Sequence, residues 1–216
     1  MPEPLTSAEP KAEPRWQAVL GLLAIGGVYL SLPERLTIGP NWTVLAVIAA
    51  LLTPTIVLHR SGSIRLSFWL GIALSALITA AIVWSLGALI AALPDKRLPP
   101  EELLRSAAAL WAGNVLVFAS WYWRLDAGGP SSRDRRHTHT EGAFLFPQMT
   151  QRGLATARAW KPGFVDYLFL AFNTSTAFSP TDVPVLSRWA KALMMVQSCI
   201  SLGTIAILAA RAINIL

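Results

Sequence analysis

The chain has 216 residues, of which 54% are hydrophobic and 14% are charged, whereas soluble domains carry about 25% charged residues. Its mean hydropathy is +0.49, and its charges gather between long apolar stretches, a pattern that excludes a soluble enzyme and indicates an integral membrane protein. The net charge of +6 comes from bases that flank apolar stretches. These bases are expected to orient the chain and to touch anionic lipid, so no nucleic-acid partner is predicted.

The first 123 residues predict a tail and four membrane helices. Residues 1–15 hold four prolines and mixed charge, which predicts a disordered tail. A transmembrane helix takes about 20 apolar residues, and four stretches within 16–123 reach or approach that length. They cover about 16–32, 42–58, 66–93 and 106–123.

Two features inside these spans predict contacts between helices. Gly71, Ser75 and Thr79 recur at four-residue spacing in the third span, and such a ridge of small residues favours close packing. Asn114 is the strongly polar residue in the interior of the fourth span. We expect its amide to bond to another helix.

Residues 124–162 are too hydrophilic to enter lipid, and they predict a basic extramembrane loop. In this loop His137, His139 and Glu141 alternate, as metal ligands on one face of a strand do. Three residues in an arginine-rich loop are weak evidence, and no metal site or cofactor is predicted. The chain also lacks a nucleophile–base pair and a phosphate-binding glycine loop, so no catalytic residue and no enzyme activity are predicted.

Residues 163–216 carry the functional information. A short apolar helix is expected over 164–172, a polar run over 173–182 and the last span over about 192–210. The stretch 164–178 is too short for a full crossing, which favours a re-entrant segment that enters the bilayer and returns. Non-helical backbone at membrane depth borders protein or water, so such a segment implies a cavity or a pore.

Residues 166–172 read DYLFLAF and residues 174–182 read TSTAFSPTD. Together with the last span, they resemble the pore helix, filter and inner helix of tetrameric potassium-channel-like proteins, whose filter has the form T-x-T-T-V-G-Y-G-D. Ser179 and Thr181 stand where that filter has glycines, and Pro180 stands between them, so the resemblance is to a degenerate filter. Glycine adopts positive φ cheaply and proline fixes φ. The resemblance therefore implies an oligomeric pore, a tetramer if channel-like, without the family's potassium selectivity.

The whole chain is also similar to a group of bacterial multi-pass membrane proteins of unknown function. The shared segments are D-Y-L-F, F-S-P-T-D and A-R-A-x-N-I-L. This resemblance implies the bacterial inner (plasma) membrane as the location, and it implies no activity.

The candidate pore-lining residues lie on the filter-like run or on one face of the last span. They are Thr174, Ser175, Thr176, Phe178, Ser179, Thr181, Asp182, Gln197, Ser201 and Thr204. A polar stripe on a membrane helix faces water or protein. The last three residues, with Arg211 in line, therefore either line a pore or make interhelical hydrogen bonds, and Arg211 could equally reach the interface.

The distribution of bases predicts the orientation. With five spans, a re-entrant segment and the N-terminus inside, 13 of the 18 lysines and arginines lie on the inner side, as cytoplasmic loops require. The re-entrant segment then enters from the cytoplasmic face, opposite to potassium channels, unless the orientation rule fails here or the segment crosses fully and makes a sixth span. We predict an all-α polytopic bundle of about five spans plus a short re-entrant helix. Its predicted function is either ion or small-solute permeation or a non-conducting structural or accessory role.

Overall fold

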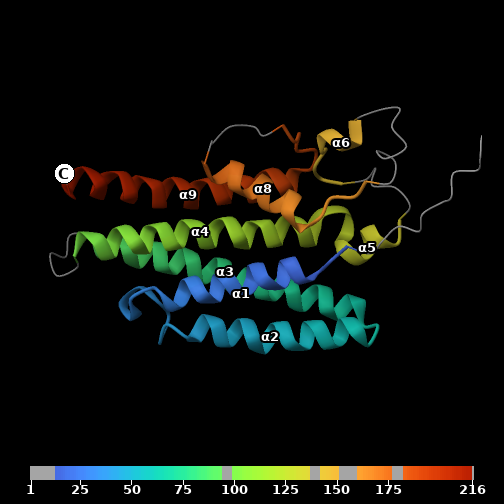
Figure 1. Ribbon diagram of the computed structural model, residues 1–216, viewed down its shortest axis with the longest axis horizontal. Helices are drawn as coiled ribbons and strands as arrows, with labels where there is room; N and C mark the ends of the chain where they lie inside the picture. The colour runs from blue at the N-terminus through green and yellow to red at the C-terminus, as the bar shows by residue number, and fades with distance from the viewer. Residues whose placement is uncertain (1–12, 94–98, 137–141, 151–159, 177–181, 216) are drawn as a thin grey trace, which may run out of the picture.

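Figure 1 shows the computed structural model of the chain, an all-α bundle, as predicted. It describes residues 13–93, 99–136, 142–150, 160–176 and 182–215, with side chains as far as residue 210. Within these ranges there is no strand, and the only β pairing is an isolated bridge between Phe144 and Val185.

Long helices run side by side along the bundle (Figure 1). They are α1 (Trp16–Leu30), α2 (Thr43–Arg60), α3 (Ile64–Ala91), α4 (Pro100–Leu125) and α9 (Arg188–Ile215). All but α1 are long and apolar enough to cross a membrane, and α1 is a shorter apolar helix of 15 residues. Large apolar side chains such as Trp69, Leu77 and Met195 are exposed on the outside of the bundle, where lipid can cover them. The chain is therefore an integral membrane protein.

Helix α4 is the centre of the bundle. It packs against α1, α3, α8 and α9, and a larger share of its residues is buried than in α2, α3 or α9. The Asn114 side chain donates to the carbonyl oxygen of Gln197 on α9 at 3.1 Å, which confirms the predicted interhelical bond. Trp121 donates to the Thr79 hydroxyl at 3.0 Å, so the small-residue ridge of α3 does pack on α4.

Short helices gather at the end of the bundle opposite the C-terminus (Figure 1). They are η2 (Asp126–Gly128), α5 (Pro130–Asp134) and α6 (Pro147–Thr150), whereas η1 (Glu34–Leu36) follows α1 at the other end. We call the first end the basic end. It contains residues 13–16, 59–65, 123–136, 142–150, 160–167 and 182–189. Most of the bases assigned to the inner side by sequence and described in the structure lie there.

A buried arginine ties the expected N-terminal tail to the basic end. Arg133 is 1% exposed, and its Nη1 donates to the carbonyl oxygens of Trp123 at 2.8 Å and Asp126 at 3.0 Å. Its Nη2 donates to Glu13 Oε2 at 3.0 Å. The Asp126 carboxylate accepts the Tyr167 hydroxyl at 2.6 Å. Residues 13–15 are therefore part of the fold, unlike the tail predicted for them.

Gly129 allows the sharp turn from α4 into α5. Its φ is +87° and its ψ is 174°, a combination that is essentially restricted to glycine. A Cβ at this position would lie 2.7 Å from the carbonyl oxygen of Arg124. The turn therefore requires a residue without a side chain.

We expect Gly129→Ala to lower the free energy of unfolding by about 2 kcal/mol or more, because alanine meets both backbone strain and this contact. Equilibrium unfolding in detergent micelles measures the change. Gly87→Ala in α3 is the control, because nothing lies within 4 Å of a Cβ there, and it should change stability by at most about 1 kcal/mol. Equal losses of unfolding free energy in the two variants would contradict the requirement for glycine at this turn.

Candidate functional site

Helix α8 (Phe164–Thr176) is too short to cross a membrane and begins at the basic end. The Phe164 ring packs on Trp123 with 6.0 Å between ring centroids. The Asp166 carboxylate accepts the backbone N–H of Gly163 at 2.7 Å. An acidic residue in the first turn both binds an N–H group that has no partner in the helix and complements the helix dipole.

The chain returns to the basic end after α8. Figure 1 shows α8 beside only part of α9, and Val185, nine residues after the helix, is already paired with Phe144 at the basic end. Trp189 at the start of α9 packs on the same phenylalanine. The described residues on either side of α8 therefore lie at the same end of the bundle, and the re-entrant course stays a prediction. The helix itself extends to Thr176, four residues beyond the predicted end.

The carbonyl groups at the end of α8 are bound by side chains of neighbouring helices. The last carbonyls of a helix have no partner within it, and at membrane depth only protein or trapped water can supply one. The Ser175 carbonyl accepts the Ser201 hydroxyl at 2.6 Å and the Trp111 indole N–H at 3.5 Å. One turn before Ser175, the Ala171 carbonyl, which is not one of these last carbonyls, also accepts Gln197 Nε2 at 2.7 Å. Helix α8 is therefore held at its inner end by α4 and α9.

Gln197 is the centre of this contact, which we call the polar seam: Trp111, Asn114, Tyr122, Ser175, Gln197 and Ser201. Its Nε2 also donates to the Ser175 hydroxyl at 2.8 Å, and its Oε1 accepts the Tyr122 hydroxyl. Gln197 and Ser201 are fully buried, as is Thr204, which bonds to carbonyls of its own helix. The polar face of the last span was expected either to line a pore or to make interhelical hydrogen bonds. Within a single chain, Gln197 and Ser201 make interhelical hydrogen bonds.

The remaining candidate pore residues fall into three groups. Thr174 is buried and its hydroxyl bonds to the Leu170 carbonyl at 2.8 Å. Thr176 and Asp182 are exposed. Three others lie outside the described residues: Phe178, Ser179 and Thr181. The side chain of Arg211, in line with the stripe, also lies outside them.

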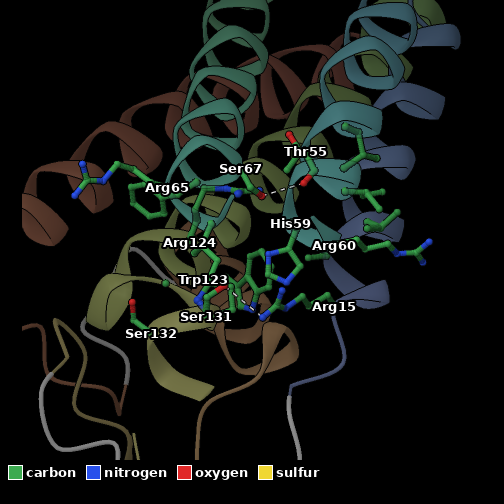
Figure 2. A pocket seen from close by; sticks show the side chains of 18 of the residues that line it. Arg15, Thr55, His59, Arg60, Arg65, Ser67, Trp123, Arg124, Ser131 and Ser132 are labelled. Carbon is green, nitrogen blue, oxygen red and sulfur yellow. Dashed lines mark hydrogen bonds between the residues drawn. The ribbon is translucent and has the colours of Figure 1, made fainter. Parts of the chain in front are cut away.

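A second candidate site lies at the basic end. A cavity of about 770 Å³ opens there between α1, α2, α3, α4 and α5 (Figure 2), a volume typical of small-molecule sites. Its basic lining residues are Arg15, His59, Arg60, Arg65, Arg124 and Arg135, and no described lining residue is acidic. Figure 2 shows Arg15, His59 and Arg124 directed inward, while Arg60 and Arg65 point away at the rim. We call this space the arginine cavity.

The innermost of these bases is Arg124, near the end of α4. Its side chain crosses α3 over Gly71, where a Cβ would lie 1.8 Å from the guanidinium Nη1. Arg124 is 8% exposed, and its Nε has no hydrogen-bond partner among the described residues. By contrast, Arg15 is paired with Asp134 at 3.1 Å and also donates to Ser131. Arg124 thus brings into the cavity a charge that no carboxylate of the described part of the chain neutralises.

Sequence reasoning missed the arginine cavity and two members of the polar seam, Trp111 and Tyr122. Each of these residues lies near the end of a span or among aromatic residues, where interfacial anchoring is the usual explanation. One signal for the cavity was present in the sequence. Gly71, which has no side chain, and the base Arg124 lie on spans expected to be antiparallel neighbours, so the arginine could cross the glycine.

No protein-family model, curated protein or solved structure matches this chain. The described residues contain no group of three side chains able to hold a metal ion, and His137, His139 and Glu141 lie outside them. The described residues form two candidate functional regions, the polar seam and the arginine cavity.

Proposed function

We propose that the chain carries a channel-like pore module made of α8, the segment that follows it and α9. The observation that supports this is the course of α8, which enters the bundle from the basic end, stops at Thr176 and leads back to that end by Val185. The C-terminal end of a helix carries a partial negative charge. In transporters, half-helix C-termini at membrane depth coordinate cations. A half-length helix placed in this way favours a cation at its inner end.

The path for a solute would lie on the exposed side of α8. On the buried side, the Ser175 carbonyl and the Gln197 side chain already have protein partners. Gln197, Ser201 and Thr204 then serve as the scaffold that holds α8, and Thr176 and Asp182 face the path. Because one such segment cannot enclose a pore, the module requires several copies of the chain, four if it follows the family that it resembles.

The proposal places the basic end in the cytoplasm of a bacterial inner membrane, because bases accumulate on that side. The pore segment would then enter from the cytoplasmic face. Potassium selectivity is not part of the proposal, since Ser179, Pro180 and Thr181 replace the glycine pattern whose carbonyls select that ion.

Cation flux into liposomes that contain the purified protein tests the proposal. We expect Asp182→Asn to reduce this flux about threefold or more at low salt, because a carboxylate at a pore mouth concentrates cations. The reduction should shrink at high salt, where the charge is screened. Glu34→Gln is the control, because it removes an exposed carboxylate from the opposite end of the bundle, and it should leave flux unchanged. Absence of flux through the wild type would refute permeation.

The second candidate function is a non-conducting structural or accessory membrane protein. The specific observation in its favour is that the buried polar groups of α8 and α9 bond to each other within one chain, as at Ser175 and Ser201. In this case α8 only packs the bundle. A monomer in mild detergent that transports no ions would favour this candidate.

A further inference from the structure

The arginine cavity holds a buried cation that lacks an anion. Burying a charge is costly unless it is paired, and within the described residues no carboxylate lies within ion-pair distance of Arg124. The guanidinium lies 5.7 Å from the centre of the Trp123 ring, which attracts the cation but does not neutralise it. Arginine side chains near a membrane surface commonly extend into water, but Arg124, at 8% exposure, is largely shielded from bulk water. The site is therefore built for an anion from outside the chain.

The walls of the cavity change from charged to apolar with depth. On α2, Ile56 and Leu52 lie one and two turns deeper than His59, respectively, along the same helix face. On α1, Leu22 lies about two turns deeper than Arg15. A free inorganic anion needs only the charged mouth. The gradient matches a molecule with an anionic head and a hydrocarbon tail.

The geometry points to an anionic phospholipid as the occupant of the arginine cavity. Its phosphate would pair with Arg124, whose fork of N–H donors fits phosphate oxygens, with Arg15 and His59 nearby. Its acyl chain would lie against Leu22 and Leu52. The site lies at the end of the apolar spans, the level at which basic pockets between membrane helices meet lipid headgroups. This inference is independent of permeation through the α8 module.

Native mass spectrometry of the full chain in a neutral detergent tests the lipid site. The probes are phosphatidylglycerol and phosphatidylcholine with identical acyl chains. We expect phosphatidylglycerol to bind about tenfold more tightly, because charged hydrogen bonds to the phosphate lack a compensating choline cation. Arg124→Gln should abolish this preference and leave phosphatidylcholine binding unchanged. Arg105→Gln, an exposed arginine near the other end of the same helix, should keep the preference.

Three results would overturn the proposal. The first is equal binding of the two lipids by the wild type, a comparison that depends on no variant. The second is an Arg124→Gln protein that still prefers phosphatidylglycerol. The third is displacement of phosphatidylglycerol by inorganic phosphate at equal concentration, which would make the occupant a soluble anion. Retained phosphatidylcholine binding in Arg124→Gln shows that the variant is folded.

Discussion

Arg133→Met is expected to lower the free energy of unfolding by about 3–5 kcal/mol, the usual loss when one partner of a buried ion pair is removed. Arg133 is 1% exposed and donates to Glu13 and to two carbonyl oxygens near the end of α4. Methionine fills a similar volume but leaves the Glu13 carboxylate, 9% exposed, without its cation. Equilibrium unfolding in micelles, followed by tryptophan emission, measures the loss.

Two further variants separate charge from packing at this site. Adding Glu13→Gln to Arg133→Met should recover part of the lost stability, because Glu13→Gln removes the unpaired carboxylate. Arg188→Met alters an exposed arginine at the start of α9, and it should change stability by less than about 0.5 kcal/mol. A double variant as unstable as the single one would show that the Arg133 contacts to carbonyl oxygens dominate.

Gln197→Met is expected to cost about 2–4 kcal/mol and to loosen α8. The substitution removes hydrogen bonds to the Ala171 carbonyl and the Ser175 hydroxyl and takes the acceptor from the Tyr122 hydroxyl. Hydrogen bonds between membrane helices are worth about 0.6 kcal/mol on average and up to about 1.7 kcal/mol each. A buried hydroxyl without a partner adds its own penalty. The same unfolding measurement reports the total.

The Tyr122 hydroxyl provides the internal check for this prediction. Tyr122→Phe added to Gln197→Met should restore part of the stability, since removing both partners costs less than leaving one buried and unpaired. Ser198→Ala is the neighbouring control, because Ser198 is only half-buried, and it should have little effect. If Ser198→Ala were as destabilising as Gln197→Met, the polar seam would not be the source of the loss.

Four of the five expected spans and the half-length helix could be predicted because hydropathy and length are local properties. The first expected span is the exception, because α1 has only 15 helical residues, fewer than a crossing requires. The polar face at Gln197, Ser201 and Thr204 could also be predicted, since it follows from helical spacing alone. Its environment could not. Whether such a face borders water or protein depends on the end of α8, which lies 26 residues away from Ser201 along the chain. The helix end at Thr176 was likewise missed, because serine and threonine also suit irregular backbone.

The arginine cavity could not be predicted for a different reason. Its walls come from four separate stretches of the chain, around residues 15–22, 52–60, 64–68 and 123–135. Each stretch alone is a span with bases at its end, which the orientation rule already explains. Only the packed bundle distinguishes an arginine exposed at the surface from Arg124, which is 8% exposed.

The anchoring of α8 also has a consequence for biosynthesis. The side chains that bind its inner carbonyls, Gln197 and Ser201, are translated after the helix itself. Until the ribosome has made the first half of α9, the end of α8 has only the Trp111 indole of α4 as a partner in place of water. We therefore expect α8 to take its final place in the bundle only after the first half of α9 has been made.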